Sequence, residues 1–131
     1  MKQRRETKQR QIILEVVQAH RDHPRADQIY EDVSKIDSRI SRGTVYRNLS
    51  CLSEGGKICH VRVPGADRYD SRTDLHYHLI CMRCGVVVDV PMDYQEKIDL
   101  MSAEKTGYRI SRHRIVVEGV CPDCQKKETD R

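Results

Sequence analysis

The sequence predicts an α+β fold made of two successive domains, and three observations support this prediction. The chain has 131 residues, 37% of them apolar and 34% charged, with no Trp or Phe, so its core must be aliphatic and modest. Three stretches with helical periodicity precede an alternating stretch typical of a β-hairpin. A polar stretch at residues 71–75 then separates these from mixed strand-like and helix-like segments. We expect domains at residues 1–72 and 73–131.

The first two helices follow from periodicity and from a proline. Residues 1–20 carry apolar side chains at steps of three and four, as on one face of a helix. A residue that precedes proline avoids helical backbone angles, so this helix should end before Pro24. A second helix should begin near Arg25 or Ala26 and turn its apolar side chains inward.

A third helix and a hairpin complete the first domain. The helix should begin at Ser41 or Thr44, whose hydroxyls suit an N-cap, and should end at the glycine pair 55–56. Alternating residues follow at 57–63 and 68–70, separated by a turn that contains Pro and Gly. Three helices followed by a hairpin is the order of a winged helix-turn-helix domain.

The second domain is predicted to be a small α/β unit. Strands are expected at His76–Ile80 and Val86–Val90, a helix from about Asp93 to Lys105, and a strand at Tyr108–Glu118. A unit of about 55 residues rarely buries enough apolar surface to be stable alone. We therefore expect a metal ion or a partner to stabilise it.

The cysteines indicate a structural zinc site. Two Cys-x-x-Cys pairs can supply four thiolates to a tetrahedral ion, and such a closed sulfur site favours Zn²⁺ with a structural role. Two unrelated turns, or a thioredoxin-like dithiol, are the alternatives, but the dithiol would explain only one pair. Cys51 and Cys59 lie outside the pairs, and Cys51 is expected to be a small buried apolar residue. The predicted ligands are Cys81, Cys84, Cys121 and Cys124.

Histidines and carboxylates form a second candidate metal site. In His76-Tyr77-His78, strand alternation places both imidazoles on one face. Asp70 precedes this pair, Asp89 ends the next strand, and His23 lies in the loop between the first two helices. Nitrogen and oxygen donors suit Fe²⁺ or Mn²⁺. Spacing alone supports only the histidine pair, because the other three residues also fit surface or capping roles.

The distribution of charge favours a nucleic-acid partner for the first domain. Residues 1–75 contain 15 basic and 11 acidic residues, and the remainder contains nine of each. A solvated basic face would explain this excess as well, but basic residues on a winged helix-turn-helix favour duplex DNA. The candidate contacts are Arg42, Thr44, Tyr46, Arg47, Asn48, Lys57 and Arg62.

Other classes of protein are less compatible with the sequence. The longest apolar runs are too short for a membrane span or a signal peptide, so we expect a cytoplasmic protein without membrane contact. An enzyme could use His76, His78 and a carboxylate, but five potential ligands leave little room for substrate, and an enzyme is not expected. A zinc-stabilised protein-interaction module would predict no DNA affinity.

Four motifs lie along nearly the whole chain: His23-Pro24-Arg25-Ala26-Asp27, Thr44-Val45-Tyr46-Arg47, His76-x-His78-x-x-Cys81-x-x-Cys84-Gly85 and Gly119-Val120-Cys121-x-x-Cys124. With these motifs in this order, the chain resembles the ferric uptake regulator (Fur) family of dimeric, metal-dependent bacterial repressors. The resemblance implies a winged helix-turn-helix domain joined to an α/β dimerisation domain, structural zinc in the cysteines, a regulatory metal between the domains, and a homodimer on a palindromic operator.

Within the family, the sequence is most similar to the peroxide-sensing (PerR) branch. The regulatory ligands of that branch match His23, Asp70, His76, His78 and Asp89. Members that regulate iron uptake tend to carry Glu at the position of Asp89. The resemblance implies that peroxide oxidises iron-bound His23 or His76. A regulator of iron, manganese, zinc or nickel uptake is the alternative.

The resemblance also bears on His113. Many family members have an additional metal site with His and Asp at the positions of Leu75 and Tyr77. This sequence lacks those ligands, so the additional site should be missing, and His113 should keep a supporting or purely structural role.

Overall fold

The chain divides into two compact units, at the junction of Asp74 and Leu75. The computed structural model describes the backbone of residues 2–129 and the side chains of residues 5–129. The junction falls within the polar stretch at residues 71–75. None of the helices in the described part of the chain is long and apolar enough to span a bilayer.

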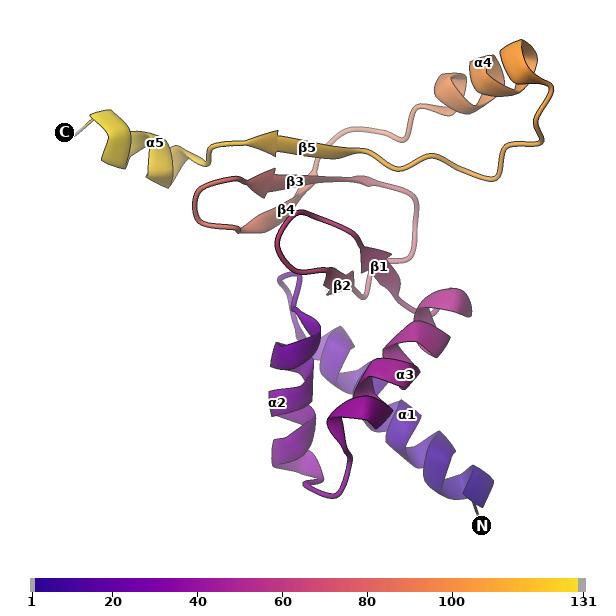
Figure 1. Ribbon diagram of the computed structural model, residues 1–131, viewed down its shortest axis with the longest axis vertical. Helices are drawn as coiled ribbons and strands as arrows, with labels where there is room; N and C mark the ends of the chain where they lie inside the picture. The colour runs from indigo at the N-terminus through magenta and orange to yellow at the C-terminus, as the bar shows by residue number, and fades with distance from the viewer. Residues whose placement is uncertain (1, 130–131) are drawn as a thin grey trace. The chain divides into compact units, whose positions relative to one another are not determined.

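The first unit is a winged helix-turn-helix, as the sequence predicts. Its three helices are followed by a two-stranded antiparallel hairpin, in which Cys59 lies opposite Asp70 (Figure 1). The elements are α1 (Lys2–Ala19), α2 (Ala26–Ile36), α3 (Arg42–Glu54), β1 (Cys59–Val61) and β2 (Arg68–Asp70).

An aliphatic core joins the helices of this unit to the wing. Apolar residues at helical spacing on each helix meet there, among them Ile13, Ile29 and Leu49, all with 0% exposure. Burial of apolar surface of this kind is the main favourable contribution to folding. The helix boundaries are set locally, since the Ser41 hydroxyl accepts a hydrogen bond from the Thr44 amide at 3.1 Å and caps α3.

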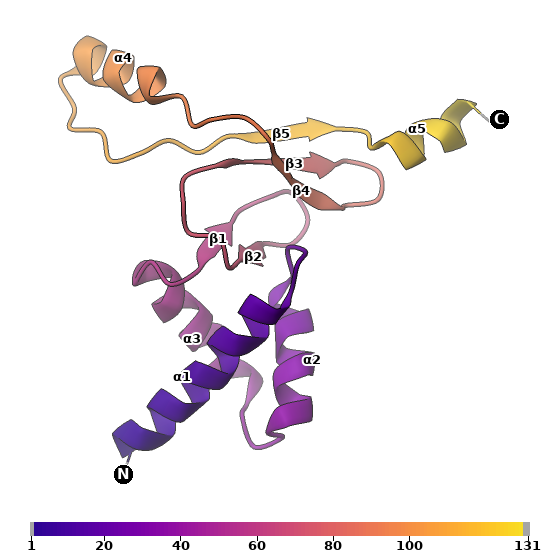
Figure 2. The ribbon, with the colours of Figure 1, turned by 180° about the vertical axis from the view of Figure 1, so that it is seen from behind.

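The second unit is a three-stranded mixed sheet with two helices. Strand β3 lies in the centre, antiparallel to β4 and parallel to β5. Helices α4 and α5 lie at opposite ends of the sheet, and neither helix packs across a face of it (Figures 1 and 2). The elements are β3 (Tyr77–Cys81), β4 (Val87–Val90), α4 (Glu96–Thr106), β5 (Val116–Gly119) and α5 (Pro122–Thr129).

The structure corrects two features of the prediction for this unit. The strand expected at Tyr108–Glu118 is wrong over most of its length, because only Val116–Gly119 is a strand. In the irregular part, the His113 amide donates to the Tyr94 hydroxyl at 3.0 Å, and so it bonds to a side chain instead of a neighbouring strand. Helix α5 was not predicted, although Pro122 and Asp123 in its first turn are helix-start signals.

Candidate metal centres and nucleic-acid interface

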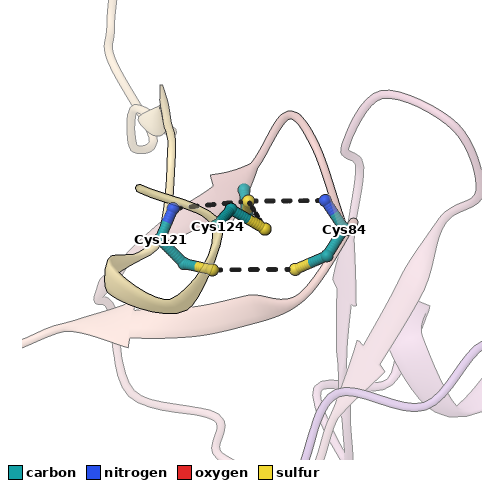
Figure 3. Close-up of side chains that lie close together, drawn as sticks. Cys84, Cys121 and Cys124 are labelled. Atoms are coloured by element: carbon teal, nitrogen blue, oxygen red, sulfur yellow. Dashed lines mark hydrogen bonds between the residues drawn. The ribbon is translucent and has the colours of Figure 1, made fainter. Parts of the chain in front are cut away.

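The four paired cysteines converge at one end of the second unit. Cys81 ends β3, Cys84 follows in the next turn, and Cys121 and Cys124 lie at the start of α5. Every sulfur is within 4.8 Å of the other three, and two of the pairs are separated by 3.8 Å (Figure 3). A tetrahedral site with Zn–S bonds of about 2.3 Å has sulfur–sulfur edges of about 3.8 Å. The cluster therefore fits a zinc ion.

Backbone amides prepare this cluster for thiolate. The amides of Cys84 and Cys121 donate to the Cys81 sulfur at 3.4 and 3.3 Å, and these bonds lower the pKa of the Cys81 thiol to about 5. Hydrogen bonding with the Cys121 thiol, together with burial, raises the pKa of Cys124 to about 12. The thiolate form of Cys81 is thus favoured even without a cation, and a bound cation would favour the thiolate form of all four cysteines.

A nitrogen donor and an oxygen donor meet near the end of the wing in the first unit. His23 Nε2 lies 3.2 Å from a carboxylate oxygen of Asp70, at the end of β2. The loop with His23 is fixed on this strand, because the Tyr69 amide donates to the Pro24 carbonyl and the Arg68 guanidinium to the His23 carbonyl. We call His23 and Asp70 the first donor set.

The second unit contains another such set, on one face of its sheet. His76 Nε2 and His78 Nε2 lie 3.2 and 3.5 Å from the same oxygen of Asp89. The strand register places His78 directly opposite Asp89, and the two imidazole centroids are 4.5 Å apart. We call these three residues the second donor set. Each set can supply ligands to Fe²⁺ or Mn²⁺.

Most of the candidate DNA-binding residues lie at the surface of the first unit. On α3, Tyr46 and Arg47 are exposed, and Arg42 donates to the Tyr46 hydroxyl at 3.4 Å. Thr44 is half-buried and accepts a hydrogen bond from Arg47 at 3.3 Å. Lys57 and Arg62, before and after β1, are also exposed. These residues leave guanidinium and ammonium groups available to a polyanion.

Asn48 is largely buried beneath this surface. Its side chain is only 8% exposed, and it accepts a hydrogen bond from Arg10 Nε at 2.9 Å and donates to the Thr44 carbonyl at 2.8 Å. Asn48 therefore joins α1 to α3. The sequence did not single out Arg10, which lines a hollow between these helices together with Arg5 and Arg47. Cys51 also lines it and is exposed, so the expectation that Cys51 is buried is wrong.

The fold and these donor sets define a winged-helix protein equipped to bind metal ions. A family model described as the ferric uptake regulator family matches residues 1–118, and the chain belongs to this family. The relatives that the chain matches include regulators and repressors by name. The peroxide operon regulator of Bacillus subtilis is 38% identical over 123 residues, which cover 93% of this chain and 85% of that protein.

Solved structures agree with this assignment. The peroxide stress regulator of Campylobacter jejuni has a TM-score of 0.74 and 26% identity, over 92% of this chain and 91% of that one. The ferric uptake regulator Fur of Helicobacter pylori has a TM-score of 0.75 over 90% and 80% of the two chains. At 23% identity, the second likeness supports the fold alone.

Proposed function

We propose that the protein is a metal-dependent repressor that binds double-stranded DNA as a homodimer. The observation that carries this proposal is that each unit presents a compact donor set: His23 with Asp70, and His76 and His78 with Asp89. Neither set alone provides a full coordination shell. One Fe²⁺ or Mn²⁺ ion shared by both sets would have five protein ligands.

A shared ion would let metal binding control DNA binding. An ion held by both units favours those arrangements of the units in which all ligands reach it. His23 is essential here, since it belongs to the unit with α3, whereas His76 and His78 belong to the other. In a dimer, this restriction sets the distance between the two α3 helices, and with it the half-site spacing of a palindromic operator.

The four clustered cysteines would hold Zn²⁺ for stability and not for sensing. Support comes from the sulfur spacing and from the amides that donate to Cys81. The ion would join the end of β3 to the start of α5, about 40 residues later in the chain. It would thereby compensate for the small core of this unit.

Helix α3 would be the recognition helix in the major groove. The exposed Arg47 is suited to a bidentate contact with guanine, and Arg42, Thr44 and Tyr46 to flanking contacts. Exposed charges in the wing, Lys57 and Arg62, would contact phosphates. Asn48 would act from inside, by holding α1 against α3.

Dimerisation is supported by the surface of α4. None of the residues of this helix is buried, and the structure describes them all. Its apolar side chains include Ile98, Leu100 and Met101, which are 40%, 70% and 43% exposed. Exposed apolar side chains grouped on one helix are typical of a surface that contacts another chain. A second copy of this chain would cover them.

The role of the first donor set can be tested with His23→Ala. This variant should keep its zinc and its dimeric state, but Mn²⁺ should no longer strengthen its DNA binding. His20→Ala is the matched control, because His20 pairs with Asp22 and Asp32 and lies outside both sets. A His23→Ala protein that binds DNA in the same metal-dependent way as the wild type would refute the shared ion.

We further propose that the signal is peroxide, sensed by oxidation of His23 or His76. The likeness to the Bacillus subtilis peroxide operon regulator supports this. H₂O₂ would transfer one oxygen atom to an imidazole carbon and leave the other as water, so that histidine loses two electrons and peroxide gains them. The donor sets would hold Fe²⁺, which would supply one-electron chemistry for this oxidation. The oxidised ring is a poor ligand, so the shared site would open.

Mass spectrometry tests this step. With Fe²⁺, peroxide should add about 16 Da, the mass of one oxygen atom, to a peptide with His23 or His76, and DNA binding should be lost. With Mn²⁺, the same dose should leave both peptides unmodified. Unmodified histidines and intact DNA binding with Fe²⁺ would favour a metal-uptake regulator of this family instead.

A further inference from the structure

Four polar side chains of the second unit are joined by hydrogen bonds: Tyr94, Asp99 and His113 close a ring, and Tyr77 joins it at His113 Nε2. None of the four belongs to a donor set. The Tyr77 hydroxyl lies 2.6 Å from His113 Nε2, and His113 Nδ1 lies 2.7 Å from an oxygen of Asp99. The Tyr94 hydroxyl donates to Asp99 and accepts from the His113 amide. We call Tyr77, Tyr94, Asp99 and His113 the polar ring.

Each member of the polar ring has a defined role as donor or acceptor. Hydrogen bonds from Tyr94 and His113 lower the pKa of Asp99, so its carboxylate is ionised and only accepts. The proton of a neutral His113 therefore lies on Nδ1, and Nε2 accepts from the Tyr77 hydroxyl. The Tyr77 oxygen in turn accepts from the Gln95 amide at 2.8 Å. The ring is thus satisfied by protein groups alone.

The polar ring connects α4 to the sheet. No residue of α4 is buried along its fully described length, and the helix lies beyond the end of the sheet (Figure 1). Asp99 is on α4, and Tyr94 and Gln95 immediately precede this helix. Tyr77 is on β3 and is only 1% exposed, and the rings of Tyr94 and His113 stack at 4.4 Å. Hydrogen bonds and one stacked pair hold α4 where an apolar core would normally do so.

The same ring acts on the strand segment that carries the second donor set. Tyr77 stands between His76 and His78, and alternation turns its side chain to the opposite face of the sheet. A rotation of the backbone at Tyr77 would therefore move both imidazoles relative to Asp89. Two hydrogen bonds to the buried Tyr77 hydroxyl oppose such a rotation.

We propose that the polar ring couples α4 to the metal-binding histidines, with Tyr77 as the positioning residue. Ordering of His76 and His78 by a metal ion would be transmitted through Tyr77 and His113 to Asp99, and so to the helix that presents the exposed apolar side chains. This inference rests on the proposed function for its metal ion. The hydrogen-bonded attachment of α4 does not depend on that ion.

The attachment is tested by Tyr77→Phe, with Tyr108→Phe as the control. Both changes remove one hydroxyl from the same unit, but Tyr108 is 73% exposed. In the zinc-loaded dimer without added Mn²⁺, amide exchange at Gln95 and in α4 should be about tenfold faster in Tyr77→Phe. It should be unchanged in Tyr108→Phe. Unchanged exchange in Tyr77→Phe would overturn the attachment.

The coupling is tested by adding Mn²⁺. In the wild type, saturating Mn²⁺ should slow amide exchange in α4. In Tyr77→Phe, saturating Mn²⁺ should no longer slow amide exchange in this helix. The Mn²⁺ affinity of Tyr77→Phe should fall by about three- to tenfold, less than for loss of a direct partner of a ligand. Zinc content should not change.

The outcomes separate the coupling from the proposed function. Wild-type protein that binds Mn²⁺ while Tyr77→Phe keeps the same affinity and the same protection of α4 would overturn the coupling alone. Wild-type protein that binds no Mn²⁺ would overturn both the proposed function and the coupling. The attachment of α4 would still be tested by amide exchange without Mn²⁺.

Discussion

Replacing Arg47 or its neighbour Asn48 in α3 by Ala should have opposite effects on protein stability and on the specificity of DNA binding. Arg47 is exposed, and its side chain donates to the Thr44 hydroxyl at 3.3 Å, so Arg47→Ala should change stability by less than about 0.5 kcal/mol. Asn48 is buried and makes two hydrogen bonds, to Arg10 and to Thr44. Its replacement should destabilise the first unit by about 1–2 kcal/mol. In a unit of this size, that corresponds to a fall in Tm of roughly 5–15 °C.

The effects on DNA binding should be reversed. If Arg47 reads a guanine, Arg47→Ala should weaken binding to the specific duplex by about 1–3 kcal/mol, or roughly 5- to 150-fold, and should hardly affect a scrambled duplex. Asn48→Ala, measured well below its Tm, should weaken both duplexes to a similar extent, because it loosens the contact of α1 with α3. The specific duplex can be selected from a random library with the wild-type protein and Mn²⁺.

Thermal denaturation and fluorescence anisotropy at one salt concentration would measure both effects. A selective loss of specific binding in Asn48→Ala, with unchanged Tm, would show that Asn48 reads a base and that its bond to Arg10 has little weight. Equal losses on both duplexes in Arg47→Ala would reassign Arg47 to phosphate contact.

Three further changes test other parts of the structure. Cys84→Ser should lose zinc and at least about 2 kcal/mol of stability, whereas Cys51→Ser, outside the cluster, should keep its zinc by metal analysis. Gly107→Ala should cost about 1 kcal/mol in denaturant unfolding because Gly107 has φ +75, whereas Gly43→Ala, in α3 with open space around it, should not destabilise. The ionised Asp99 carboxylate, whose pKa is lowered, contributes stability that is fully present above the ordinary aspartate pKa of 3.8 and is lost as pH falls through the lowered pKa. The stability difference between wild type and Asp99→Asn should therefore shrink as pH falls below about 4.

Local signals in the sequence were sufficient for the fold class. The first three helices carry clear periodicity and boundary residues, and the structure confirms the winged helix-turn-helix order. The cysteine pairs were recognisable because two intervening residues suffice to turn both thiols toward one ion. The His76–His78 pair was recognisable for a similar reason, since it depends only on strand alternation.

Contacts between distant segments were beyond local reasoning. Asn48 follows Arg47 directly in α3, and the sequence does not distinguish its exposure from that of Arg47. Its side chain is buried because α1 packs against it, and the contact is made by Arg10, which lies 38 residues earlier in the chain. The segment before β5 has strand-forming residues, yet the hydroxyl of Tyr94, 19 residues earlier, takes the His113 amide. Periodicity and spacing describe neighbours along the chain and do not report which segments meet.

The most direct test of a metal-dependent repressor is the affinity of the zinc-loaded protein for its selected duplex, with and without Mn²⁺. We expect at least about tenfold tighter binding with saturating Mn²⁺, since a shared ion must favour the DNA-binding arrangement to act as a regulator. Equal affinity in both conditions, with zinc content unchanged, would contradict regulation by metal.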